Sequence, residues 1–123
     1  MVFNVLAYRD DRGKAPVVEW ILGLSVKARR KVFARLERLK EHGHMLRRPE
    51  TEYPRDGVYE LRATYRGMQY GILYFFFKRT SIILTHGLTK KTPSIPEREI
   101  ERAIARKQAF QGDPAIHTYE GEL

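Results

Sequence analysis

The chain has 123 residues, enough for one domain with a modest core, and its 42% apolar content is too high for a disordered protein. Lys and Arg outnumber Asp and Glu by 23 to 15, so the formal net charge is +8. The absence of Cys excludes disulfides and thiolate metal sites and fits a reducing cytoplasm, and the longest apolar run, Ile72 to Phe77, is too short to cross a bilayer. The N-terminus has no signal-peptide pattern, which also favours a cytoplasmic protein.

The first predicted elements are a strand and two helices. Apolar and polar residues alternate over residues 3–8, which predicts the strand. Pro16 suits an early helical position, and this short helix is expected to end at Gly23. Ser25 is a good N-cap for a second helix over residues 26–42. The apolar stripe of that helix comprises Ala28, Val32, Phe33, Leu36 and Leu39.

Residues 44–56 are predicted to form a loop, because Pro and Gly residues punctuate them. Three strands follow, separated by tight turns at Gly67 and at residues 78–80. They are expected at residues 58–66, 68–78 and 81–88. The pattern Ser94-Ile95-Pro96-Glu97 then resembles a capping box with Pro in the first turn, which predicts a final helix.

This order of elements, β-α-α-β-β-β-α, predicts an α+β fold. Hairpins between the last three strands imply a small, mostly antiparallel four-stranded sheet. The two N-terminal helices should form a hairpin on one face of the sheet, and a C-terminal helix completes the fold. Residues 1–110 are expected to form a single domain and residues 111–123 a tail. The uncovered face of the sheet is where functional side chains are expected.

The positive charge is concentrated before residue 108. Residues 108–123 carry three acids and no Lys or Arg, so the first 107 residues hold 23 bases against 12 acids, a net charge of +11. Such a field attracts phosphate backbones, anionic membranes or an acidic partner protein. Arg outnumbers Lys by 15 to 8, and Arg is better suited to bidentate phosphate contacts and base stacking. Charge alone is equally compatible with an ordinary solvated basic surface.

Two groups of polar residues are candidates for chemistry. Arg62 and Arg66 should project from the same face of one strand, and His86, Lys90 and Lys91 lie in or just after the last strand. Antiparallel pairing could bring the two groups onto one concave surface. Metal-free RNA cleavage needs a base, cations that hold the phosphate and an acid. Arg62, Lys90 and Lys91 are candidates for the cations, and His86, Glu60 or a Tyr for the acid or base.

Each of these residues also has a structural interpretation. A single His in an apolar strand, such as His86, is more often a hydrogen-bonded core residue than a catalyst. Glu60 could simply form a cross-strand ion pair. Lys90 and Lys91 could merely line a turn, although two cations before a helix favour a phosphate site. The four His residues show no ligand spacing, so neither a metal nor another cofactor is expected.

The chain is similar to a known family over most of its length, from Phe3 to about Phe110. The segments that carry the similarity read Val-Tyr-Glu-Leu-Arg at residues 58–62, Tyr-Gly-Ile-Leu-Tyr at 70–74 and His-Gly-Leu-Thr-Lys-Lys-Thr-Pro at 86–93. They resemble the phage-derived HigB-type branch of the RelE/ParE toxin superfamily. The resemblance implies the toxin of a type II toxin–antitoxin pair, which cuts mRNA on the ribosome and binds a helix-turn-helix antitoxin.

The resemblance also implies roles for individual residues. Arg62, His86, Lys90 and Lys91 match motif positions and are therefore assigned to catalysis. Gly71 stands where relatives often have an Arg that faces the cleft, and there is no Tyr shortly after Lys91. Other side chains would then have to bind the RNA. The residues assigned to that role are Tyr65, Arg66 and Arg79.

Two other functions remain open from the sequence. A ParE-like protein would inhibit DNA gyrase by binding and would not be an enzyme. An inactive toxin homologue would survive only as the partner of its antitoxin. The departure at Gly71 keeps the second alternative open, because in some members of the superfamily the missing Arg holds the scissile phosphate.

Overall fold

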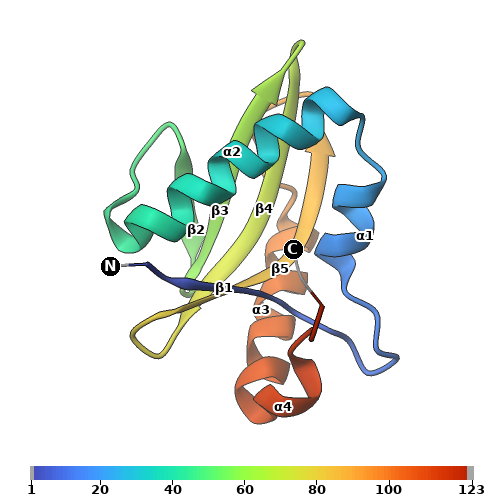
Figure 1. The fold of residues 1–123 in the computed structure, drawn as a ribbon, viewed down its shortest axis with the longest axis vertical. Helices are drawn as coiled ribbons and strands as arrows, with labels where there is room; N and C mark the ends of the chain where they lie inside the picture. The colour runs from blue at the N-terminus through green and yellow to red at the C-terminus, as the bar shows by residue number, and fades with distance from the viewer. Residues whose placement is uncertain (1, 122–123) are drawn as a thin grey trace.

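A computed structural model describes residues 2–121 and contains one five-stranded sheet with helices against it (Figure 1). The strands are β1 (Asn4–Ala7), β2 (Thr51–Arg55), β3 (Val58–Tyr65), β4 (Met68–Phe77) and β5 (Ser81–Lys90). The helices are α1 (Pro16–Leu22), α2 (Val26–His42), α3 (Glu97–Gly112) and α4 (Pro114–His117), with a 3₁₀ turn at Gly43–Met45. Within residues 2–121, no helix combines the length and apolar character needed to cross a membrane.

The strand order is β1-β5-β4-β3-β2, in which β1 runs parallel to β5 and the other pairs are antiparallel. The predicted α+β fold is therefore confirmed, but the sheet has five strands and not four. The additional strand, β2, lies in the segment predicted as a loop. It pairs with β3 at the edge of the sheet and has an irregular register between Glu52 and Arg55. Pro54 is tolerated there because an edge strand needs only some of its N–H groups for pairing.

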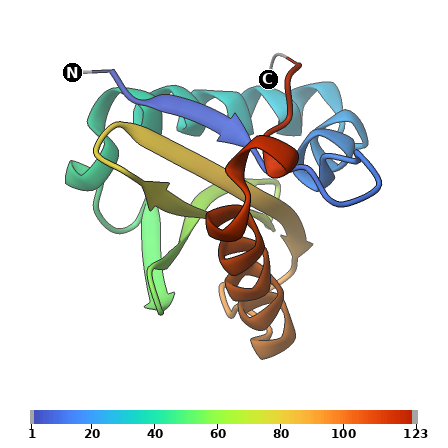
Figure 2. The same cartoon turned by 90° about the horizontal axis from the view of Figure 1, so that it is seen from below.

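Helices cover both faces of the sheet, and the expectation of an uncovered face is wrong. Figure 2 shows α1 and α2 on one side of the strands and α3 on the other. The reason is the composition of β4, whose residues Ile72 and Tyr74 pack in one core cluster while Leu73 and Phe75 pack in others. A strand that is apolar on both faces must be covered on both.

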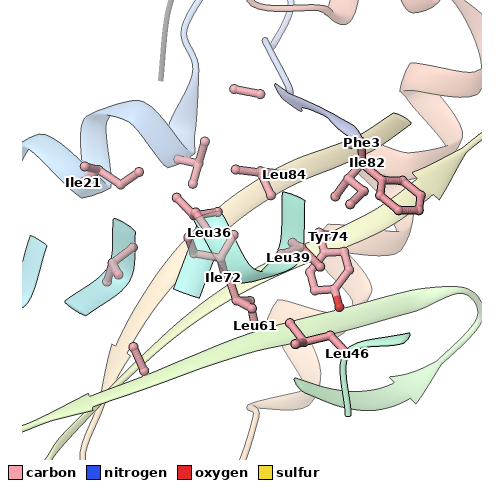
Figure 3. Packing of buried hydrophobic residues seen from close by; sticks show 14 of the residues in the cluster. Phe3, Ile21, Leu36, Leu39, Leu46, Leu61, Ile72, Tyr74, Ile82 and Leu84 are labelled. Carbon is pink, nitrogen blue, oxygen red and sulfur yellow. The ribbon is translucent and has the colours of Figure 1, made fainter. Parts of the chain in front are cut away.

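The larger core lies between the sheet and helices α1 and α2 (Figure 3). Leu36 and Leu39 of α2 pack with Leu61, Ile72 and Leu84 from the central strands. Helix α1 is attached to β5 through Trp20, whose ring packs against Gly87. A Cβ on Gly87 would lie only 2.1 Å from the nearest ring atoms. Its indole Nε1 donates a hydrogen bond of 3.1 Å to Thr89 Oγ1.

On the opposite face, α3 packs against the sheet through smaller clusters. Phe110 contacts Phe75, and Ala103 packs with Val58 and Leu73. Because these contacts hold α3 over β3, β4 and β5, the polar residues on this face lie beneath or beside the helix.

The segment predicted as a tail continues with structure. Helix α3 extends to Gly112, and the short helix α4 follows it. The chain then returns to the outer edge of β1, where Tyr119 N donates to Ala7 O at 2.9 Å and Arg9 N donates to His117 O at 2.8 Å. His117 also stacks on Tyr8, with ring centroids 5.2 Å apart. These contacts join the C-terminal segment, up to the last described residues, to the first strand.

Candidate functional site

Arg62 of β3 and Lys90 at the end of β5 lie on the two sides of one carboxylate. Glu60 is fully buried, and its Oε1 accepts a hydrogen bond of 2.6 Å from Arg62 Nε. Its Oε2 lies 2.8 Å from Lys90 Nζ, in an ion pair that lacks hydrogen-bond alignment. Because a buried carboxylate requires compensating charge, Glu60 draws both cations toward itself. One of their two positive charges is thereby neutralised within the site.

Gly71 of β4 provides the space for this carboxylate. It pairs with Arg62 across the strands, two positions along from the pair formed by Glu60 and Leu73. A Cβ on Gly71 would lie 2.0 Å from Glu60 Oε2 and 2.8 Å from its Cδ. No larger residue fits at position 71 while Glu60 keeps its place. The position at which the resemblance leads one to expect an Arg is therefore covered by a carboxylate in this chain.

Both cations also fix the turn that follows β5. Arg62 donates a hydrogen bond of 2.9 Å from its terminal NH2 to Pro93 O, and Lys90 Nζ donates one of 2.8 Å to the same oxygen. The Arg62 side chain keeps 23% of its exposure and the Lys90 side chain 11%. Lys91 is exposed beside them. The positive charge that an approaching anion meets is thus that of Lys91 and of the outer part of Arg62.

His86 lies beneath α3 and connects that helix to β5. Its Nε2 is 3.2 Å from Glu99 Oε1, its Nδ1 is 3.0 Å from Thr85 Oγ1, and its side chain is 6% exposed. Burial, together with the nearby charge of Arg106, lowers the pKa of His86 to about 4. A neutral ring can donate from Nε2 to Glu99, while its Nδ1 lies beside Thr85 Oγ1, whose hydroxyl donates to Leu73 O at 3.1 Å. This geometry favours the structural interpretation of His86.

Tyr65 and Arg66 lie at the same end of the sheet as Lys90, whereas Arg79 lies at the other end. Tyr65 ends β3, and Arg66 follows in the turn, with φ of 50° and its guanidinium 5.5 Å from the Tyr65 ring centroid. The alternation of residues predicted that Arg66 shares a strand face with Arg62. Arg66 instead lies in the turn after β3, so this prediction is wrong. Arg79 lies in the turn between β4 and β5, and the ten residues of β4 separate the two turns by roughly 30 Å (Figure 1).

Glu52, which the residue pattern did not predict as a site residue, also belongs to this site. Glu52 lies on β2 opposite Glu60, and its Oε2 is 3.7 Å from the Arg62 NH1 group. Its side chain is 22% exposed and also forms an ion pair with Arg48. A signal was present, because Asp56-Gly57 is a common hairpin turn and implies a strand before it as well as after it. Both turn residues have positive φ, 55° and 75°.

The side chains that meet in the site are two cations and two carboxylates. Within residues 2–121, no group of three His, Asp or Glu side chains is placed to hold a metal. The cations that converge are Arg62 and Lys90, with Glu60 and Glu52 beside them, and the exposed Lys91 follows Lys90 in the chain. The arrangement can bind an anion at its rim, and it has one partly exposed carboxylate, that of Glu52, within reach of the Arg62 guanidinium.

Comparison with known proteins identifies a family. No curated protein matches the sequence. Residues 19–108 match the model of the family described as phage derived protein Gp49-like (DUF891). The match begins within α1 and ends near the end of α3, so it includes β2 to β5 and every residue placed at the candidate site. Since the match covers well over half of its length, the chain belongs to the Gp49-like family of phage-derived proteins.

Proposed function

We propose that this protein is the toxin of a type II toxin–antitoxin pair and that it cleaves mRNA on the ribosome. Membership of a phage-derived family is compatible with this proposal, and the resemblance to HigB-type toxins suggests it. The observation that carries the proposal is the convergence of Arg62 and Lys90 on Glu60, with Lys91 exposed beside them. These cations come from two strands and a turn, which gives a phosphodiester more than one positive group in a fixed arrangement.

The proposed reaction is an attack by the RNA 2′-oxygen on the adjacent phosphorus. The 2′-oxygen forms a new bond to phosphorus as the bond to the 5′-oxygen breaks, which leaves a 2′,3′-cyclic phosphate and a 5′-hydroxyl. Lys91 and the outer part of Arg62 stabilise the charge that develops on the phosphate oxygens, while Lys90 and Glu60 hold Arg62 in position. Glu52 accepts the 2′-OH proton in this proposal, and water supplies the proton for the leaving 5′-oxygen.

His86 has no part in this reaction. A buried imidazole whose pKa is lowered to about 4 carries little charge near pH 7, and it faces Glu99 of the protein itself. The proposal therefore departs from the catalytic assignment of His86 that the resemblance suggested. It relies on positioning and charge stabilisation, with the ribosome positioning the mRNA.

The test is expression without an antitoxin, followed by mapping of transcript 5′ ends and by cleavage of mRNA on purified ribosomes. Arg62→Ala and Lys91→Ala should each relieve growth arrest and slow cleavage by roughly 10²-fold, a usual cost for losing one charge-stabilising group. The matched controls are Arg12→Ala and Lys14→Ala. They remove equal charges from the exposed loop between β1 and α1, which contains none of the candidate site residues. Circular dichroism should show that all four variants fold. Undiminished arrest in the folded Arg62 and Lys91 variants would refute the proposal.

A second candidate function, an inactive toxin homologue that only binds an antitoxin, is favoured by the position of Glu60. Its carboxylate occupies the space that a side chain at residue 71 would fill, and it neutralises part of the cationic charge. The same experiment distinguishes the two functions. Absence of arrest and of ribosome-dependent cleavage in the unmodified protein would favour the inactive homologue.

A further inference from the structure

A basic groove runs between α2 and the outer edge of β3, on the side of the sheet away from β1. It encloses a cavity of about 320 Å³. The residues that line it are Lys31, Ala34, Arg35, Arg38, Ala63 and Thr64. Figure 1 shows α2 crossing the sheet in front of β3. Lys31, Arg35 and Arg38 of this helix line the groove.

The charge of the groove is fixed by one carboxylate, that of Glu50. Arg35 NH1 lies 2.6 Å from Glu50 Oε2, and Arg38 donates hydrogen bonds of 2.7 and 2.8 Å to its two oxygens. The hydrogen bond from Arg38 has the largest effect and that from Arg35 adds to it, and together they lower the pKa of Glu50 to about 2. Glu50 is therefore ionised near pH 7. The three bases and one acid leave two positive charges in surplus. Helix α2 as a whole carries seven bases and two acids, which extends the field beyond the groove.

Beside this groove, near the end of β3, Thr64 has no strand from residues 2–121 next to its outward backbone groups. The last residue pair between β2 and β3 joins Thr51 to Leu61, and Arg62 N then donates to Glu50 O at 2.8 Å. Because N–H groups alternate in direction along a strand, the N–H and C=O of Thr64 point the same way as those of Arg62, away from β4. Within residues 2–121, no strand follows β2 along this part of the edge.

We propose that this groove binds an extended acidic segment of a partner protein, which adds to the sheet as a short strand beside β3. The open edge supplies backbone hydrogen bonds, and the bases of α2 supply charge complementarity. Both features are needed to choose the occupant. Basic residues alone would suit a nucleic acid equally well, but the open backbone edge at Thr64, just beyond the end of β2, matches another polypeptide.

The geometry also specifies the pattern of the partner segment. In an added strand, alternate side chains face the α2 side of the sheet, where Lys31, Arg35 and Arg38 lie. Acidic residues are therefore expected at every second position. A segment bound there would lie next to Arg62, and so would also restrict access to the candidate site. The inference concerns a separate surface and does not depend on RNA cleavage.

The test uses the full chain and a labelled twelve-residue peptide of alternating Glu and Thr, titrated by fluorescence anisotropy. A second peptide, in which Lys replaces Glu, should not bind. Lys31→Glu should weaken binding of the acidic peptide by about tenfold or more, because a like charge then faces the ligand. Lys14→Glu makes the same change of charge in an exposed loop outside the groove, and it should alter the affinity by less than about twofold.

Hydrogen exchange provides the readout of strand addition. The Thr64 amide should exchange rapidly in the free protein and become at least about tenfold slower with the acidic peptide bound. Equal affinity of the Lys31→Glu and unmodified proteins, or no protection of Thr64, would overturn the proposal. So would a twelve-nucleotide single-stranded RNA that binds in a Lys31-dependent manner where the peptide does not, since the groove would then be a nucleic-acid site.

Discussion

The carboxylate of Glu60 lies directly over the backbone of Gly71, on the neighbouring strand. The contact is so close that a Cβ at residue 71 would be 2.0 Å from Glu60 Oε2. Glu60 is fully buried and forms ion pairs with Arg62 and Lys90. Because Gly71 has no side chain, the carboxylate has room to pack against the backbone of β4. This relationship connects a sequence departure to the electrostatics of the site.

Gly71→Ala should therefore destabilise the protein by about 2–4 kcal/mol, because the Glu60 carboxylate must move away from its cations. Urea unfolding followed by circular dichroism measures the change. Gly112→Ala is the matched control, since a Cβ there meets nothing within 4 Å, and it should change the stability by less than about 0.5 kcal/mol. Equal effects of the two substitutions would show that Glu60 does not occupy the position described.

Glu60→Gln tests whether Glu60 reduces the cationic charge that RNA meets. Loss of the carboxylate charge leaves Lys90 without its partner and Arg62 with only the more distant Glu52, so the free energy of unfolding should fall by about 3–5 kcal/mol, the usual cost of breaking a buried pair. The affinity for a single-stranded RNA should rise in low salt and depend more steeply on salt concentration. Filter binding over a salt series measures both changes. An unchanged salt dependence would mean that Glu60 does not reduce the positive charge that RNA meets at this site.

Glu50→Gln tests the ion pairs at the start of the basic groove. Hydrogen bonds from Arg38 and Arg35 lower the pKa of Glu50 from 4.5 to about 2. The ionised form therefore stabilises the folded state above pH 4.5, and this contribution is lost as the pH falls from 4.5 toward 2. At pH 7 the substitution should cost about 1–2 kcal/mol, less than the full shift, because the Arg38 side chain is half exposed.

The measurement is urea unfolding of the Glu50→Gln and unmodified proteins at several pH values. The two stabilities should converge as the pH approaches 2. Glu37→Gln, which changes an exposed acid of the same helix, provides the control. A constant difference between pH 7 and pH 2.5 would contradict the assignment of the stabilising effect to the Glu50 carboxylate.

His86 should remain neutral through the physiological range. Its folded-state pKa of about 4 lies below the value of 6.5 for an unperturbed imidazole, mainly because of burial. The unfolded chain therefore binds the proton first, and the contribution of His86 to stability is lost as the pH falls from 6.5 toward 4. The imidazole proton signals in an NMR titration should stay constant between pH 8 and about pH 5.5. A midpoint near 6.5 would show that the ring is solvated, which would restore His86 as an acid–base candidate.

Much of this fold is determined locally and could be predicted from the sequence. Ser25 accepts a hydrogen bond from Ala28 N at the start of α2, and Gly43 ends that helix, as expected for a capped amphipathic segment. The three central strands were predicted because their apolar residues and turns are contiguous. The convergence of Arg62 and Lys90 also followed from the order of those strands.

The remainder depends on contacts between segments that are distant in sequence. Strand β2 is short, polar and interrupted by Pro54, and it becomes a strand only because β3 supplies its partner groups. Helix α3 covers the second face of the sheet because β4 and β5 are apolar on both sides, so His86 becomes buried instead of exposed. Burial and pairing are properties of the packed molecule, and they decided that Glu60 forms ion pairs with Arg62 and Lys90, where the sequence left open whether Glu60 is an ion-pair partner or an acid or base. The sequence by itself determined which residues carry charge and in what order, and the tertiary structure decided which charges meet.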